Sequence, residues 1–430
     1  MSNLGGDIQE IPDYRKSNST VKLRDCLLGG LAMFSLKDSS LLSYVKNYKA
    51  RASNLSSVYG IKACPSDGAM RKILDGVSPS DLIDLYKSPL KELKSHGLLD
   101  SYLYLGKYLT VSIDGVHHFS SKKVCCEKCL EAHHQDGTIT YSHKCLAGAL
   151  VHPDKGEVFV VGSEAIVKSD GESKNDSELN ASKRLLPLIT NHLSGYPLLV
   201  LEDALYGNGP HIKELQSHGH SFIISAKEGS QKSLFRQFKS LRTKKKTRIV
   251  KKNRVERKRN GTRKVICTYE YANDLYLNDS HTDISVNMVW YEERVAETGV
   301  LLKKFCFITD IKMNKQIVKE VVRAGRSRWK IENETFNTLK NQGYHFMHNF
   351  GHGHQHLSTV FCILMMLAFT IDQIAQASDK YFKRALRERG SKKSLWEKVR
   401  QYFDIVSVRD METIYKIIGK EIKLKVEIIV

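Results

Sequence analysis

Apolar residues recur at helical spacing over the first hundred positions of the chain. Residues 21–44 and 67–98 place them three and four positions apart, and residues 65–67 set a capping residue ahead of the second run. We therefore expect a helical N-terminal domain over residues 1–105. Two short helices within residues 67–86 could form a DNA-binding helix-turn-helix or belong to a plain packing domain, and the spacing alone does not choose between them.

Near residue 107 the pattern changes to short β-rich runs that are typical of strands. Three consecutive runs predict an antiparallel meander. Helices and strands then alternate, which predicts an α/β fold with a mixed sheet. The expected elements are strands at 108–113, 144–152 and 157–163, a helix at 177–193, a strand at 196–201, a helix at 210–218 and a strand at 221–225.

Basic residues dominate one stretch of the next segment, whose pattern stays strand-like to about residue 310. Residues 244–264 hold twelve Lys and Arg against one Glu. A charge run is often only a solvated surface, but this one alternates with Ile, Val and Thr. We therefore favour a basic β-ribbon that follows a phosphate backbone. Its expected DNA contacts are Lys251, Lys252, Arg254 and Arg257.

The charge of the whole chain agrees with such a partner. The 430 residues hold 67 Lys and Arg against 47 Asp and Glu, a net charge of +20 that implies nucleic acid or an acidic membrane as partner. The longest apolar run, residues 360–371, is too short to span a bilayer and is expected to be a buried core helix. The polar N-terminus suggests no signal peptide, and nine unevenly placed cysteines suggest no secreted disulfide framework. We expect a cytoplasmic protein without a membrane partner.

A late helix carries one glutamate on its apolar face. At 3.6 residues per turn, Glu332 shares a face with Trp329 and Phe336, whereas Glu334 points to the opposite side. A carboxylate among apolar side chains is costly unless it is paired. Arg328, one turn earlier, could form an ordinary ion pair with Glu332. Alternatively, Glu332 faces inward because it binds a metal ion together with acids from elsewhere in the chain.

Two aspartates are the acids that could join it. Asp114 and Asp203 each follow a predicted strand, where an open sheet presents its reactive groups. Glu202 competes with Asp203, but only one of two successive strand residues faces the site, and we prefer Asp203. Carboxylates are the ligands that Mg²⁺ prefers, and two such ions about 4 Å apart catalyse phosphodiester chemistry. The sequence thus predicts that Asp114, Asp203 and Glu332 bind two Mg²⁺, with Mn²⁺ as a possible substitute.

The three acids lie in motifs that resemble those of the DDE transposases of bacterial insertion sequences. The motifs are SIDG at Asp114, LVLEDALYGN at Asp203 and RWKIENETFNTLKNQGY at Glu332, and the resemblance covers roughly residues 105–375. The chain looks most like the cut-and-paste branch that has a β-rich insertion between the second Asp and the Glu. The resemblance implies an RNase H-like catalytic domain and a homodimer on double-stranded DNA.

The resemblance also implies roles for residues beside Glu332. Arg328 and Lys340 would contact phosphates at the element ends, and Trp329 would pack against or stack on the DNA. The chain departs from the signature of that branch in two places. Gly325 stands where the family has Tyr, and Lys340 follows Glu332 by eight residues rather than seven.

Five segments follow from the patterns and the resemblance. We expect a helical N-terminal domain at 1–105, an RNase H-like catalytic domain in two parts at 106–226 and 311–377, a basic β-rich insertion at 227–310 and a helical tail at 378–430. The predicted activity is cleavage of DNA at the ends of a mobile element and their joining to target DNA, at the nucleoid in the bacterial cytoplasm. Two alternatives remain open: an RNase H-like nuclease without strand transfer, and a DNA-binding relative without catalysis.

Cysteines and histidines form two further groups. Cys126, Cys129, His133 and His143 have the spacing of a zinc knuckle, although a hairpin loop with incidental thiols explains them equally simply. A second group follows the late helix, and we expect it to contact phosphates or cap helix ends rather than bind zinc. Its members are His345, His348, His352, His354 and His356.

Overall fold

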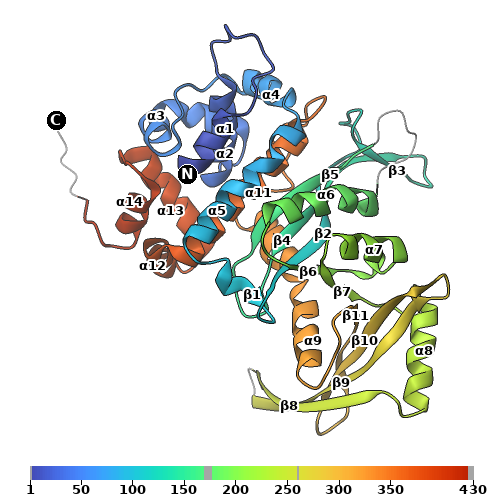
Figure 1. Ribbon diagram of the computed structural model, residues 1–430. Coiled ribbons are helices and arrows are strands. Elements are labelled where there is room, and N and C mark those ends of the chain that lie inside the picture. Colours follow the sequence, from blue (N-terminus) through green and yellow to red (C-terminus); the bar gives the residue numbers. More distant parts are fainter. Residues whose placement is uncertain (1, 169–176, 259–260, 425–430) are drawn as a thin grey trace.

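The computed structural model describes residues 2–168, 177–258 and 261–424, and one mixed β-sheet runs through it (Figure 1). Along the hydrogen-bonded path the strand order is β3-β4-β2-β6-β7-β11-β10-β9-β8, with β5 beside β4 and β1 beside β2. Helices from both ends of the chain gather at one end of the molecule, and the strands of the insertion form the other end (Figure 1). The predicted α/β class with a mixed sheet is confirmed.

The first half of the sheet has the predicted order of strands and helices. The strands β2 (Tyr108–Ser121), β4 (Ile139–Leu150) and β5 (Phe159–Ile166) form an antiparallel meander, and β6 (Leu198–Glu202) and β7 (Ser221–Ser225) continue the sheet parallel to β2. The helices α6 (Glu178–His192) and α7 (Gly209–Ser217) lie between these strands in sequence. Each begins at a polar cap, because the side chains of Ser177 and Asn208 accept backbone N–H bonds. This arrangement agrees with an RNase H-like fold.

One expected boundary is wrong. Strand β2 does not end before Asp114 but continues to Ser121, because residues 115–121 pair with residues 141–146 of β4. A short strand that the pattern did not predict, β3 (Leu130–His133), pairs with β4 at the edge of the sheet. Asp114 therefore lies within a strand.

The insertion extends the same sheet instead of forming a separate one. It contains α8 (Lys232–Thr243), β8 (Arg248–Lys258), β9 (Gly261–Asn278), β10 (His281–Val295) and β11 (Leu301–Thr309). Strand β11 pairs with β7, which joins the two halves, and β8 is left as the outer edge. The helix α8 lies across this part, where Phe238 stacks on Trp290. Residues 259 and 260 of the predicted basic run lie outside the described residues.

The N-terminal segment is helical and packs on one long helix from the other end of the chain. Its helices are α1 (Ser2–Gln9), α2 (Leu23–Ser35), α3 (Leu41–Tyr59), α4 (Asp67–Asp75) and α5 (Lys87–Ser95), followed by the short strand β1 (Leu103–Tyr104). The long helix is α11 (Leu357–Ser378). At Gly30 a Cβ would come within 2.8 Å of Leu364, so glycine allows α2 and α11 to cross closely.

Helix α11 is the expected buried core helix. Within the described ranges it is the single helix long and apolar enough to cross a membrane by length and composition, and 94% of its most apolar window is buried in the protein. It packs against α2 on one side and β5 on the other. Its apolarity is therefore explained by the core that it fills.

The C-terminal helices complete the N-terminal helical layer. They are α12 (Lys380–Arg389), α13 (Lys392–Ile405) and α14 (Met411–Ile418). Asn54 of α3 joins the two ends of the chain, because its amide donates to the backbone carbonyls of Phe403 and Val406 at 2.8 and 2.7 Å. Segments more than 340 residues apart in sequence thus share one hydrophobic core.

Candidate active site

Asp114 and Asp203 lie on neighbouring parallel strands at the same level of the sheet. The paired residues of β2 and β6 end with Ser112 opposite Leu201, and two further residues along each chain segment bring Asp114 level with Asp203. Neighbouring strands are about 4.8 Å apart, so both carboxylates emerge close together. Asp203 follows the end of β6 and caps a short turn, accepting the backbone N–H of Leu205 at 2.8 Å. The sheet therefore positions both aspartates through its backbone register.

Glu332 reaches the same place from an interrupted helix. The helix α9 (Ile317–Ser327) gives way to a turn, then to the π-helical segment η5 (Ile331–Phe336) and to α10 (Asn337–Asn341). Arg328 in the turn donates from Nη1 to Asp114 Oδ2 at 3.1 Å and from Nη2 to Glu332 Oε1 at 2.9 Å. Its own carbonyl accepts the hydroxyl of Ser112 at 3.0 Å, which holds the turn on β2. One arginine thus bridges the first and third predicted acids.

The electrostatics at Asp114 reflect this crowding. Burial and the neighbouring carboxyl of Glu332 together raise the pKa of Asp114 to about 7, against the opposing effects of the Arg328 charge and of the backbone N–H of Gly115. A carboxyl group whose pKa is held up by burial and by a like charge gains from an added cation. The site is therefore suited to bind positive charge.

A fourth acid, Glu178, lies at the same place and was missed in the sequence. A Cβ on Gly115 would come within 2.5 Å of Glu178 Oε1, so this side chain lies directly over the residue after Asp114. Burial raises the pKa of Glu178, and Asp203 adds to the shift. The sequence signal was hidden because acids in the first turn of a helix are common for the helix dipole alone. A glycine next to a strand aspartate was the available hint that something packs there.

Tyr206 lies close to several of these acids. Its hydroxyl is buried and has no hydrogen-bond partner among the residues that the structure describes. Burial raises the pKa of Tyr206, and the carboxylates that add to the shift are those of Glu202, Glu178, Asp114 and Asp203. A site for a hydrated cation would leave such a hydroxyl without a protein partner, because a water on the cation would be its partner.

The two rival acids are placed differently. Glu202 is fully buried, and both of its carboxylate oxygens lie within 2.9 Å of Nε2 of His211. Glu334 is exposed, whereas the side chain of Glu332 is 36% exposed and touches Arg328. The geometry therefore groups Asp203 and Glu332, but neither rival, with Asp114.

The predicted DNA-contacting residues near the acids differ in exposure. Arg328 is buried, and its guanidinium is engaged with the two acids rather than open to solvent. Trp329 is 47% exposed and packs against that guanidinium at 5.1 Å. Lys340 is exposed on α10. Trp329 and Lys340 are thus available at the surface, whereas Arg328 belongs to the acid cluster.

Both departures from the family signature have a structural explanation. A Cβ at Gly325 would lie 2.8 Å from the ring of Phe307, so α9 lies directly on β11 and a tyrosine there does not fit. The π-helical turn holds one residue more than an α-helical turn. Eight residues from Glu332 to Lys340 therefore cover about the same rotation as seven residues of a regular α-helix.

The predicted contacts on the basic strand also fall into two groups. Lys251, Lys252 and Arg257 are exposed on β8. Arg254 instead donates to Glu256 at 2.6 Å and to the buried Glu293 at 2.8 Å. Because side chains alternate along a strand, Lys251 and Arg257 share the face opposite to Arg254.

The cysteines and histidines come together in a set that differs from the predicted one. Cys126, Cys129 and His143 meet His352 of the second group. His133, the expected fourth member, is not part of this set: it lies on β3, where its Nε2 is 3.3 Å from the carboxylate of Glu131, the residue that shares its strand face. Two other late histidines, His354 and His356, contribute their backbone at the start of α11. The carboxylate of Asp75 accepts the N–H groups of His354, Gln355, His356 and Leu357 at 2.9–3.0 Å.

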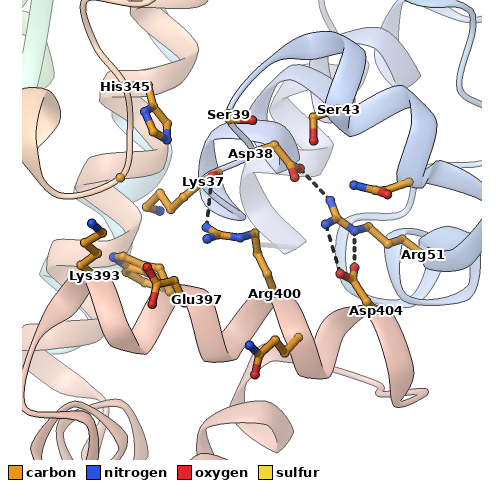
Figure 2. A pocket seen from close by; sticks show the side chains of 14 residues that line it. Lys37, Asp38, Ser39, Ser43, Arg51, His345, Lys393, Glu397, Arg400 and Asp404 are labelled. Atoms are coloured by element: carbon orange, nitrogen blue, oxygen red, sulfur yellow. Dashed lines mark hydrogen bonds and ion pairs between the residues drawn. The ribbon is translucent and has the colours of Figure 1, made fainter.

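A cavity of about 570 Å³ lies between the N-terminal and C-terminal helices, and none of the four acids lines it (Figure 2). Arg51 of α3 is paired there with Asp38 at 2.7 Å and also with Asp404 of α13. Arg400 donates to the backbone carbonyl of Lys37 at 3.1 Å. Since these cations already have partners, we interpret the cavity as a joint between helices rather than as a ligand site.

Comparison with known families agrees with the fold. Residues 158–370 match the family model of the transposase DDE domain, a range that includes Asp203 and Glu332 and begins after Asp114. Fold and site thus define an enzyme that processes nucleic acids. The chain belongs to the DDE transposases of insertion sequences. No curated protein matches the chain.

Proposed function

We propose that the protein is a cut-and-paste transposase, which cleaves DNA at the ends of its mobile element and joins the freed ends to target DNA. The observation that carries the proposal is the convergence of Asp114, Asp203 and Glu332, in which Arg328 bridges Asp114 and Glu332 and the strand register brings Asp203 beside Asp114. These acids come from two strands and a helix that are widely separated in sequence. Such an assembly has no evident structural purpose, because it brings like charges together in a half-buried place.

The residues present fit two Mg²⁺ ions, or Mn²⁺ in their place. Hard carboxylate oxygens are the ligands that these ions prefer, and the raised pKa of Asp114 and the unpaired hydroxyl of Tyr206 mark a place where positive charge and water are favourable. Asp114, Asp203 and Glu332 would hold the ions. When bound, the ions activate a water or 3′-hydroxyl nucleophile and stabilise the leaving oxygen.

The chain's own side chains supply position and orientation. The register of β2 and β6 fixes the two aspartates rigidly, whereas Glu332 closes the site from a helix. Arg328 neutralises part of the carboxylate charge and sets the direction of Glu332. Trp329 and Lys340, exposed beside the site, would contact the element ends.

The proposed partners are double-stranded DNA of the element ends and of the target, bound by a homodimer in the cytoplasm at the nucleoid. The net charge of +20 and the exposed Lys251, Lys252 and Arg257 on β8 support a long contact with phosphates. A homodimer follows from the need to cut two ends together. The domain division at residues 105, 226, 310 and 377 is part of the same proposal.

Cleavage of a labelled DNA that carries the element's own ends, in the presence of Mg²⁺, tests the proposal. We expect Glu332→Gln to lower cleavage by roughly a hundredfold or more, since a lost metal ligand costs several kcal/mol in the transition state. Glu334→Gln is the matched control two residues away and should cut like wild type. Glu178→Gln should lower cleavage less than Glu332→Gln does. Mobility-shift binding should be retained in all three variants.

Wild-type activity in Glu332→Gln would contradict the proposed site. A second substrate separates a transposase from a nuclease: with ends already cut, a transposase joins them to target DNA, whereas a nuclease leaves them unjoined. Absence of joined products under conditions that give cleavage would contradict strand transfer alone.

A further inference from the structure

Two thiols and two imidazoles come together where the β2–β4 hairpin meets the loop after α10. The thiols of Cys126 and Cys129 lie 3.9 Å apart, and Nε2 of His143 is 3.4 Å from each of them. Nε2 of His352 is 3.3 Å from the thiol of Cys129 and 3.1 Å from Nε2 of His143. All four ligand atoms lie within 4.8 Å of one another.

These distances are those of a tetrahedron around one ion. Zinc binds sulfur at about 2.3 Å and imidazole nitrogen at about 2.0–2.1 Å, which at tetrahedral angles separates two sulfurs by about 3.8 Å, sulfur from nitrogen by about 3.6 Å and two nitrogens by about 3.3 Å. Each of these five distances lies within about 0.3 Å of its expected value. Two thiolates with two imidazoles at tetrahedral spacing favour zinc over the harder cations.

The surroundings of the cluster also suit a metal ion. Nδ1 of His352 donates to the carbonyl of Gly353 at 2.9 Å, which leaves the lone pair of Nε2 directed at the other three ligands. Cys129, His143 and His352 are buried. The ring of Phe119 packs on His352 at 4.5 Å and shields the cluster on one side.

We propose that Cys126, Cys129, His143 and His352 bind one structural Zn²⁺, which fastens the loop after the Glu332 helix to the hairpin of β2. Three ligands come from the hairpin and its loop, and the fourth comes from 209 residues further along. A site closed by four protein ligands leaves no position for substrate, so its role is structural.

The proposed zinc site holds the segment that follows the helix of Glu332. His352 lies in the loop between α10 and α11, where Gly351 and Gly353 both have positive φ. Asp75 of α4 holds the next residues through their backbone N–H groups. Zinc at His352 would therefore fix this loop to β4 and to the loop before β3, and β4 pairs with the strand that carries Asp114. The proposal does not depend on DNA cleavage, because the ion would be bound with or without activity at the acids.

Two simpler explanations make different predictions. A disulfide between Cys126 and Cys129 needs a sulfur separation near 2.05 Å, far below the distance found. Another candidate group, His118 with Cys145 and Cys362, lies close by, since His118 stacks on His143 at 5.9 Å. It offers three ligands in a largely apolar core. The variant Cys362→Ser shows whether this second group holds the ion instead.

Metal analysis of the full-length protein, purified with zinc and a reductant, tests the proposal. We expect about one zinc per chain that survives dialysis. Cys129→Ser and His352→Ala should lose it. Their matched controls should keep it: Cys125→Ser, an exposed thiol one position from Cys126, and His133→Ala, the histidine that lies outside the cluster. Cys362→Ser should also keep it.

Replacement of zinc by Co²⁺ tests the ligands and geometry of the site in the wild-type protein, without a substitution. We expect a thiolate-to-cobalt charge-transfer band and the intense ligand-field bands of tetrahedral cobalt, with the charge-transfer band weakened in Cys126→Ser. Wild-type protein without stoichiometric zinc and without these bands would overturn the proposal. Loss of the ion in His133→Ala but not in His352→Ala would overturn the ligand set.

Discussion

His220 carries a neutral imidazole in a buried place between α6 and β7. Its Nε2 lies 2.7 Å from the hydroxyl oxygen of Thr190, which itself donates to the carbonyl of Leu186, so Nε2 is the donor of this pair. Nδ1 is buried and has no partner among the described residues. Burial lowers the pKa of His220 to about 4, with a smaller contribution from His218. A second proton on the ring would therefore be a buried, unpaired charge.

This arrangement predicts a loss of stability in acid. The pKa of His220 in the unfolded chain is about 6.5, so its contribution to the free energy of unfolding is fully present above that pH. The contribution disappears as the pH falls towards 4, by an amount on the order of 2–3 kcal/mol. His220→Gln keeps a donor at the position of Nε2 but cannot be protonated. Its midpoint of urea unfolding should thus fall less than that of wild type between pH 6.5 and 4. His96→Gln, at an exposed position, is the control, and equal pH dependence in all three proteins would contradict the prediction.

Single residues also mark where prediction from the sequence stops. Asp114, Asp203 and Glu332 could be selected because each follows a recognisable local pattern, and the structure places all three together. Glu178 could not, because its position over Gly115 depends on how α6 packs on the sheet. The pairing of His352 with Cys129 was missed for the same reason, since nothing local joins residues 223 positions apart.

At the scale of elements, several regular strands and helices were predictable, whereas the short edge strand β3 and the irregular elements were not. The strand at Ser221–Ser225 has the expected bounds, because a short apolar run between turns is a local signal. The helix of Glu332 was expected to be regular, and its predicted face included Trp329. The π-helical turn breaks this regularity, so Trp329 is 47% exposed while Ile331 and Thr335 are buried.

The π-helical turn makes a prediction about deletions. Removal of the exposed Asn333 takes one residue from the turn and allows a regular α-helix, with Arg328 and Lys340 kept on their present sides. We expect a folded protein whose melting temperature falls by only a few degrees. Deletion of the partly buried Lys319 from the regular helix α9 rotates every preceding contact by about 100° and should prevent folding.

Thermal unfolding followed by circular dichroism compares the two deletions directly. Both remove one polar residue from the same stretch of chain, and they differ chiefly in the kind of turn that loses it. Equal damage from both would show that the extra residue is not absorbed by the π-helical turn. Cleavage by the Asn333 deletion then reports whether Glu332 keeps its position.

At the scale of the whole molecule, one sheet connects the acids to the basic strand. The order β2-β6-β7-β11-β10-β9-β8 runs without a break from the strand of Asp114 to the outer edge (Figure 1). The sequence predicted a β-rich insertion but could not predict this continuity, because it depends on the pairing of β11 with β7. A rigid sheet can hold the basic edge at a fixed distance from the site of cleavage.

The basic edge predicts a measurable salt dependence. Lys251 and Arg257 lie on the outward face of β8, together with Val255, which is 61% exposed. If this face follows a DNA backbone, each lost phosphate contact reduces the slope of log K against log salt by about 0.9. The double variant Lys251→Ala/Arg257→Ala should therefore bind DNA with a slope smaller by about 2, and with a similar loss of affinity for every DNA sequence.

Arg254→Ala on the same strand is the matched control. It removes one positive charge, against two in the double variant, from a side chain that is already paired with Glu256 and Glu293, and Arg326 remains paired with Glu293 at 2.8 Å. We expect this variant to keep the wild-type slope. Fluorescence anisotropy across a range of salt concentrations measures all three slopes. An unchanged slope in the double variant, or an equal reduction in Arg254→Ala, would mean that the outward face of β8 is a solvated edge, and the positive charge would then have to act from another face of the molecule.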